Sequence, residues 1–168
     1  MMARAHPKIA LRPFLPDDAP LLAEIFRTSV MDLTGEDYTE AQQQAWASAA
    51  DDEAAFAKRL SNQLTLVASL EGSGIGFASM GLGGKIDMLY VHPAAVGQGA
   101  GAMLIDALER LAGARGTEKL IVDASDTARG FFEKRGYIAQ QRNTISTGDE
   151  WLANTTLHKP LAAKREAP

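Results

Sequence analysis

The spacing of apolar and polar positions in the first thirty residues predicts a strand followed by a helix. The stretch KIALR (8–12) alternates between apolar and polar residues and stops at Pro13, as a short strand does. Asp17 or Asp18 then provides a helix cap. The apolar residues that follow recur at helical spacing: Leu21, Leu22, Ile25, Phe26 and Val30.

Two further helices and a hairpin are expected next. Thr39 and Gln42 stand in the spacing of a capping box before one helix, and residues 53–60 predict another. The runs LTLVASL (64–70) and IGFASM (75–80) are joined by EGSG, which indicates an antiparallel hairpin.

The middle of the chain predicts a strand–helix–strand unit. KIDMLYV (85–91) is a strand pattern, and a glycine-rich segment leads from it into an amphipathic helix that ends at Gly116. KLIVDA (119–124) alternates little, which favours a strand covered on both faces. TARGFFEKR (127–135) predicts a short helix before Gly136.

The last third alternates between apolar and polar residues around TGDE and predicts an antiparallel pair. The whole order is strand, two or three helices, three strands, helix, strand, helix and two strands. We therefore expect a mixed α/β fold whose only parallel pairing comes from the central unit. Residues 1–168 are expected to form one domain, with a frayed tail over 161–168.

Composition and charge narrow the function. The 168 residues are 46% hydrophobic, which suits one core, and the formal net charge of −4 argues against nucleic-acid binding or an anionic membrane surface. Cysteine is absent, which excludes disulfides and thiolate chemistry. The N-terminus has no signal-type apolar region and no window is apolar enough to span a membrane, so we expect a cytoplasmic protein.

The segment VGQGAGAML (96–104) predicts a phosphate site. Its glycines precede a helix, where free N–H groups and the helix dipole favour an anion, and the alternative is a tight turn with no ligand. Gly97, Gly99 and Ala102 also satisfy the dinucleotide fingerprint, with Asp123 as the ribose-binding acid. The preceding hairpin and the short antiparallel remainder leave no room for a second nucleotide-binding half.

Two segments resemble the motifs of one family. IDMLYVHPAAVGQGAGAMLIDALE (86–109) resembles motif A of the GNAT superfamily of N-acyltransferases, and VDASDTARGFFEKRGY (122–137) resembles its motif B. The resemblance implies a mixed, largely antiparallel sheet that splays at its centre, with helices on both faces. It also implies transfer of acetyl from acetyl-CoA to a primary amine of a small molecule or peptide, by direct attack. A nicotinamide-dependent oxidoreductase and a non-catalytic acyl-CoA sensor remain as alternatives.

The resemblance assigns the coenzyme A site residue by residue. The pantetheine arm lies along the strand end at Leu89, Tyr90 and Val91. The pyrophosphate lies on the turn formed by Val96, Gly97, Gln98, Gly99, Ala100, Gly101 and Ala102. Motif B contributes Ser125, Ala128, Phe131, Phe132 and Arg135, with the last of these near the 3′-phosphate or on a solvated helix face.

Three positions depart from the family pattern. Val96 replaces a Gln or Arg, so the turn must bind through its backbone. Ser125 replaces an Asn and either contacts the pantetheine or caps a helix. Phe132 replaces the Tyr that protonates the departing thiolate in many members, which leaves Ser125 or water as the acid.

Asp87 is the candidate base, because it lies two residues before Leu89 on the same strand face. The alternative is a salt-bridged acid, with Lys85 as its partner. Tyr90 is expected in the core. The candidate acceptor-pocket residues are Tyr38, Trp46, Trp151 and Asn154, although Trp46 also fits the core. The histidines lack partners at metal spacing, so no metal site is expected, and the edge strands of the last hairpin allow a homodimer.

Overall fold

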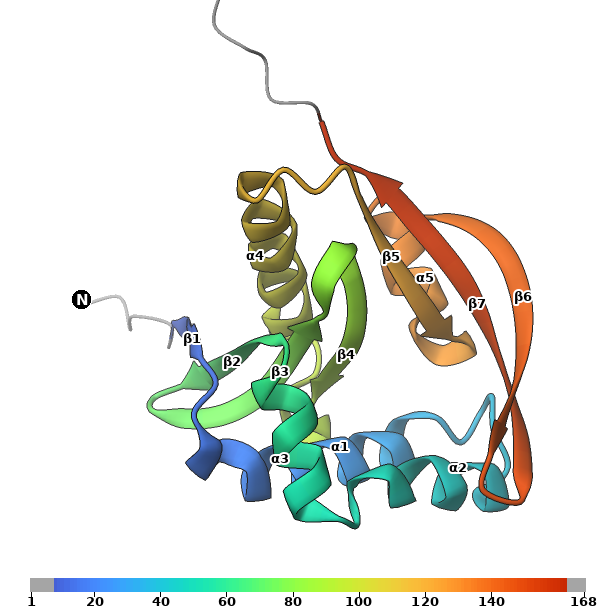
Figure 1. Ribbon diagram of the computed structural model, residues 1–168. Helices are drawn as coiled ribbons and strands as arrows, with labels where there is room; N and C mark the ends of the chain where they lie inside the picture. The colour runs from blue at the N-terminus through green and yellow to red at the C-terminus, as the bar shows by residue number, and fades with distance from the viewer. Residues whose placement is uncertain (1–7, 163–168) are drawn as a thin grey trace, which may run out of the picture.

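The computed structural model describes residues 8–162, which form one seven-stranded sheet in the order β1-β2-β3-β4-β5-β7-β6 (Figure 1). Of the tail expected to fray, 161–168, the part from residue 163 onward lies outside the described residues. The strands are β1 Ile9–Pro13, β2 Leu64–Leu70, β3 Ser73–Met80, β4 Lys85–Val91, β5 Lys119–Ser125, β6 Ile138–Thr147 and β7 Glu150–Pro160. The helices are α1 Ala19–Leu33, α2 Glu40–Ala47, α3 Glu53–Ser61, α4 Ala100–Ala114 and α5 Asp126–Lys134.

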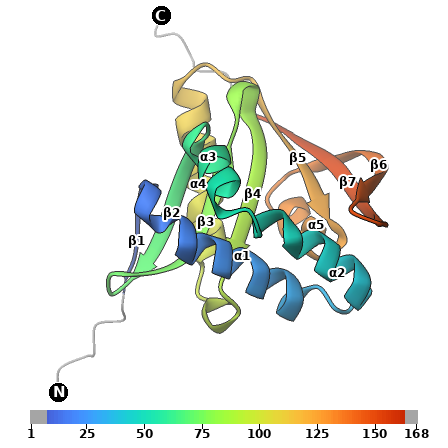
Figure 2. The same cartoon turned by 60° about the horizontal axis from the view of Figure 1, so that its bottom comes forward.

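The sheet divides between β4 and β5, its one parallel pair. These strands are in register at only two positions, Lys85 with Ile121 and Ile86 with Val122, while every other neighbouring pair is antiparallel. Beyond Ile86 the two strands separate, as Figures 1 and 2 both show. The mixed, splayed sheet confirms the expected fold and excludes the doubly wound sheet of a dinucleotide-binding domain.

Two apolar layers cover the sheet. On one face, α1 and α3 pack on β2, β3 and β4 through Phe26, Phe56, Phe77 and their neighbours, all buried. On the other face, Leu104 and Leu108 of α4 lie in a single buried cluster with residues of β2 to β5 and β7. Figure 2 shows that α1 and α2 run past the end of the sheet at which β4 and β5 separate. No helix among residues 8–162 has both the length and the apolar character needed to cross a membrane.

Two details of the sequence prediction change. Asp18 lies at the start of α1, but its carboxylate accepts from Leu15 N–H at 2.8 Å and pairs with Arg12 at 2.6 Å rather than capping that helix. β5 was expected to be covered on both faces, and it is not: Leu120, Val122 and Ala124 are buried, whereas the intervening residues are at least partly exposed. The second face of β5 is free because α1 and α3, the helices on that side, pack on β2, β3 and β4.

The capping box at Thr39 and Gln42 is confirmed. The Thr39 hydroxyl accepts from Gln42 N–H at 3.2 Å, and Gln42 Oε1 accepts from Thr39 N–H at 2.9 Å. The reciprocal pair fixes the residue at which α2 begins. Trp46 lies on this helix and faces the sheet.

Candidate active site

A cavity of about 190 Å³ lies where β4 and β5 separate, and we call it the central slot. Residues of α1, β4, β5 and α5 line it, including Asp87, Leu89, Val91, Ser125, Ala128 and Phe132. The structure thus brings residues of both motifs around one cavity, although they lie up to 45 positions apart in the chain.

The backbone of β4 turns polar groups into the slot. His92 N–H donates to Ile75 O at 2.7 Å, so His92 and, by alternation, Tyr90 turn their backbone groups toward β3. Leu89 and Val91 then turn theirs toward the slot. The carbonyl of Val91 already accepts from Ser29 Oγ at 2.8 Å. Of the three residues assigned to the pantetheine arm, Tyr90 thus faces the wrong way for a backbone contact.

The turn after β4 supplies free N–H groups at the start of α4. Gly97 and Gly99 have φ values of 86° and 92°, a left-handed conformation that favours glycine. A Cβ at either position would meet nothing within 4 Å, so the space above the turn is open. The hydrogen bonding of α4 begins with Met103 N–H donating to Gly99 O at 3.1 Å. The preceding N–H groups are available to an anion, and the Val96 side chain beside them is 53% exposed.

A second cavity of about 280 Å³ adjoins the slot, and we call it the outer pocket. It shares five residues with the slot: Trp46, Asp87, Tyr90, Asp123 and Ser125. The β6–β7 hairpin forms its far wall through Ile145, Thr147, Leu152, Ala153 and Asn154. A group bound in one cavity therefore borders a group bound in the other.

Asp87 lies between the two cavities and is paired with a cation. Arg59 donates Nε to Oδ2 at 2.7 Å and Nη2 to Oδ1 at 2.6 Å, and Gln63 Nε2 donates to Oδ2 at 3.0 Å. Burial alone would raise the pKa of Asp87, but these hydrogen bonds and the charge of Arg59 hold it below its ordinary value. Lys85, the partner expected from the sequence, instead pairs with Asp123 at 2.7 Å.

Tyr90 packs in the apolar layer as expected, and its hydroxyl also reaches the cavities. Its ring lies edge-on to Phe26 with centroids 4.6 Å apart. The hydroxyl accepts from Trp46 Nε1 at 3.2 Å, and burial raises the pKa of Tyr90 to about 12. Trp46 is half-buried and lines both cavities, so it belongs to the core edge and to the site together.

Ser125 caps α5, which settles one of its two expected roles. Its Oγ accepts from Ala128 N–H at 3.1 Å. Among residues 8–162 its own hydroxyl proton has no acceptor, so it remains a donor toward the cavities that Ser125 lines.

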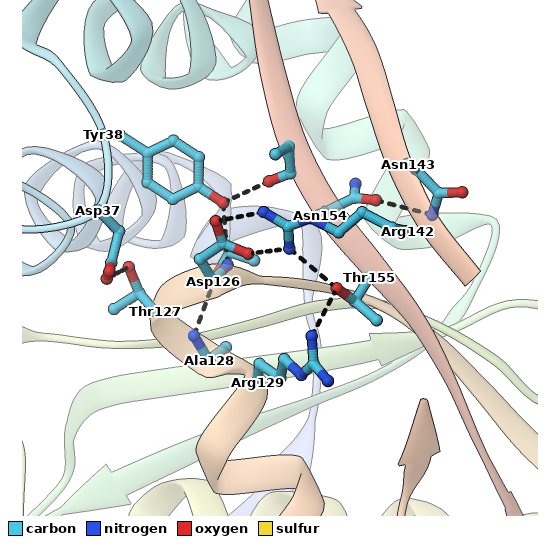
Figure 3. A network of polar contacts seen from close by, with 12 residues as sticks. Asp37, Tyr38, Asp126, Thr127, Ala128, Arg129, Arg142, Asn143, Asn154 and Thr155 are labelled. Atoms are coloured by element: carbon cyan, nitrogen blue, oxygen red, sulfur yellow. Dashed lines mark hydrogen bonds and ion pairs between the residues drawn. The ribbon is translucent and has the colours of Figure 1, made fainter. Parts of the chain in front are cut away.

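Tyr38 joins three segments at the rim of the outer pocket (Figure 3). Its hydroxyl donates to Ala153 O at 2.6 Å and accepts from Asp126 N–H at 2.9 Å. Thr127 Oγ1 donates to Asp37 at 2.7 Å beside it. The loop before α2 is thereby fastened to the start of α5 and to β7. Tyr38 is 6% exposed, so it shapes the pocket wall through its ring while its hydroxyl is occupied.

The motif B aromatics pack rather than donate protons. Phe132 is 2% exposed and lies edge-on to Tyr137, with centroids 5.1 Å apart. Phe131 packs beneath the start of α4, where a Cβ at Gly101 would lie 3.6 Å from its ring. Arg135, expected near a 3′-phosphate, is paired with Asp106 and stacked on Phe131 at 5.5 Å. A phosphate would have to compete with that carboxylate.

Three of the four residues predicted for the acceptor pocket line the outer pocket, and one does not. Tyr38, Trp46 and Asn154 line the outer pocket. Trp151 does not, because alternate strand residues face opposite ways and its neighbour Leu152 points inward, leaving Trp151 62% exposed. Sequence reasoning missed Arg59, whose contact with Asp87 joins positions 28 apart and leaves no local pattern. In the described part of the chain, no group of three or more His, Cys, Asp or Glu side chains is placed to hold a metal.

Comparison with known proteins identifies the family. A family model described as an acetyltransferase (GNAT) domain matches residues 34–153. The uncharacterized N-acetyltransferase YafP of Escherichia coli (strain K12) is 30% identical over 146 residues, which cover 87% of this chain and 92% of YafP. A crystal structure from Rhodopseudomonas palustris, described as a GCN5-related N-acetyltransferase and as an aminotransferase of class II, is 61% identical. It has a TM-score of 0.90 and covers 96% of this chain and 99% of that one.

More distant structures share the fold. The PaiA N-acetyltransferase of Thermoplasma acidophilum, in complex with coenzyme A, is 18% identical with a TM-score of 0.75, covering 91% of this chain and 99% of that one. YncA of Salmonella typhimurium, a putative acetyltransferase with acetyl-CoA, is 20% identical with a TM-score of 0.63, covering 96% and 98%. The family model and the close relatives agree with the splayed sheet and both motifs: this chain belongs to the GNAT superfamily and is an N-acetyltransferase.

Proposed function

We propose that the protein transfers the acetyl group of acetyl-CoA to a primary amine of a small molecule or peptide. The observation that carries the proposal is the pair of adjoining cavities with a carboxylate at their border. The strand that opens them, β4, leads into the turn with free N–H groups. The coenzyme A and acetyl-CoA complexes of the two distant neighbours support the choice of donor.

In this proposal the pyrophosphate lies on the backbone of residues 97–102. The glycines leave the approach open, and the helix dipole of α4 favours the negative charge. The pantetheine arm then runs along the free edge of β4, where Leu89 and Val91 turn their backbone groups outward. The thioester lies near the border of the two cavities, with its carbonyl polarised by a backbone N–H of β4.

The amine enters from the outer pocket and attacks the thioester carbonyl carbon. A carbon–nitrogen bond forms, the carbon–sulfur bond breaks, and coenzyme A leaves as thiolate. Asp87 attracts the cationic amine, which must lose one proton before it attacks and a second when the carbon–nitrogen bond forms. Because the pKa of Asp87 is lowered, these protons pass on to solvent rather than staying on the carboxylate. The thiolate takes a proton from water, or from the Ser125 hydroxyl, which then regains one from water, because Phe132 has none to give. Positioning of the two reactants supplies most of the acceleration.

Three measurements test the proposal. Calorimetric titration with acetyl-CoA, coenzyme A and NAD should give affinity for the first two alone. Release of free thiol from acetyl-CoA, followed with a panel of primary amines, should depend on the amine, and mass spectrometry should find the product heavier by one acetyl group. Absence of acetyl-CoA affinity would contradict the proposal, and affinity without turnover across the panel would favour the sensor.

A further inference from the structure

Each acidic side chain of the outer pocket already has hydrogen-bonded partners. Asp87 receives three hydrogen bonds from two side chains. Asp123 receives one from Lys85 Nζ at 2.7 Å and one from Thr156 Oγ1 at 2.6 Å. The Tyr38 hydroxyl both donates and accepts. Both acidic side chains of the pocket thus have hydrogen-bonded partners, and Asp87 keeps 22% of its side chain exposed toward a cationic group.

The unpaired polar groups that line the outer pocket are donors. Arg59 uses Nε and Nη2 on Asp87, and within residues 8–162 its Nη1 has no partner. Asn154 Oδ1 accepts from Asn143 Nδ2 at 2.9 Å, which leaves Asn154 Nδ2 without an acceptor among the described residues (Figure 3). The hydroxyls of Ser125, Tyr90 and Thr147 also have no acceptor for their protons among residues 8–162. The guanidinium is the only one of these groups that carries charge.

We infer that the acceptor is a small amino-carboxylate, a free amino acid or a close analogue. The inference rests on the proposed function, because it places the amine at the border with the slot. The ammonium group lies toward Asp87, and the carboxylate lies on Arg59 Nη1 and Asn154 Nδ2. Arg59 and Asp87 are in direct contact, so the two charges of the ligand meet two opposite charges side by side. A guanidinium edge suits a carboxylate in geometry as well as charge.

Matched substrate pairs test the inference. Acetylation would be measured for α-, β- and γ-amino acids and for the carboxamide of each, with kcat/KM referred to the concentration of neutral amine. At least one acid should exceed its carboxamide by about tenfold or more. R59Q should bring that ratio close to one. N154A, which leaves the Asp87 pair intact, should reduce it several-fold, because one donor to the carboxylate is lost.

K58Q is the matched control, since Lys58 is an exposed cation on the same helix that lines neither cavity. It should leave the acid-to-amide ratio unchanged. Equal rates for acids and carboxamides, or turnover of neutral polyamines alone, would overturn the inference while leaving acetyl transfer intact. Calorimetry with acetyl-CoA on the unmodified protein and on each variant distinguishes failure of the inference from failure of the proposed function. If the unmodified protein had no affinity for acetyl-CoA, the proposed function and the inference would both be overturned.

Discussion

The guanidinium of Arg59 and the carboxylate of Asp87 form two parallel hydrogen bonds, 2.7 and 2.6 Å long, at the border of the two cavities. The pair joins α3, which covers one face of the sheet, to the strand that opens the slot. It neutralises the carboxylate without removing it from the site, since Asp87 keeps 22% of its side chain exposed.

The Asp87 pair should make stability depend on pH at the acid end. Because the pKa of Asp87 is lower in the folded chain, the stabilisation is complete above the ordinary aspartate pKa of about 3.9 and is lost as pH falls through the folded value. D87N should lower the free energy of unfolding by about 1–2 kcal/mol at pH 7 and flatten its fall below pH 4. Urea titrations at several pH values measure this.

Asp106 provides the control for that prediction. It also pairs with an arginine, but its side chain is 50% exposed on α4. D106N should therefore change the free energy of unfolding by less than about 0.5 kcal/mol. An acid slope that is the same in D87N and in the unmodified protein would contradict the role given to the Arg59 pair.

Gly99 should be required by the turn before α4. Its φ of 92° would strain an alanine by about 1–2 kcal/mol, and the new Cβ would stand in the open space above the N–H groups. G99A should lower the melting temperature and weaken coenzyme A binding several-fold, as read by calorimetry. G113A, within α4 and away from any neighbour, should instead stabilise the protein by about 0.5–1 kcal/mol and bind coenzyme A normally. Equal behaviour of the two variants would disprove the assignment.

A polar side chain at position 96 should strengthen the phosphate site. Val96 is 53% exposed beside the turn, so V96R gives a cation that reaches the ligand without displacing the core. Coenzyme A should bind about three- to tenfold more tightly at low salt, and the gain should shrink as salt is added. L82R, at an exposed position before the opposite end of β4, is the control for added charge alone. A similar gain in L82R would point to general electrostatics instead.

The Tyr38 hydroxyl should shape the outer pocket. Y38F leaves Asp126 N–H and Ala153 O without their shared partner, at a cost of about 1–3 kcal/mol in unfolding free energy. The KM for the amine should rise while the affinity for coenzyme A holds. Y137F removes another buried phenol, one that donates to Glu109 at 3.2 Å and lines neither cavity. It should reduce stability without changing the KM for the amine, and a rise of KM in both variants would refute a local effect.

The local pattern of the sequence predicted most of the fold. The bounds of β4 are those expected, the capping box at Thr39 is present, and the hairpin forms, although β3 begins at Ser73 rather than at residue 75. These features depend on neighbouring residues, whose spacing the sequence records directly. The alternation of β5 was misread, because a run of branched apolar residues looks the same whether one face or both are covered.

The pairings within the site could not be predicted in this way. Asp87 pairs with Arg59 rather than with Lys85, and Arg135 pairs with Asp106 rather than lying on a solvated helix face. Each contact joins separate elements, and its partner is decided by the packing angles of helices on the sheet. Asn154 and Trp151 illustrate the same limit: alternation puts them on opposite faces of β7, but the packing of α2 and β5 against β7 decides which face borders the pocket.

The Tyr38 hydroxyl bond to Ala153 also orders events during synthesis of the chain. The two residues are 115 positions apart, and the second lies on the last strand of the sheet. A ribosome must therefore have passed residue 153 before the wall of the outer pocket can close, whereas the turn before α4 is complete about fifty residues earlier. The residues of the proposed phosphate turn are therefore synthesised before those that complete the wall of the outer pocket.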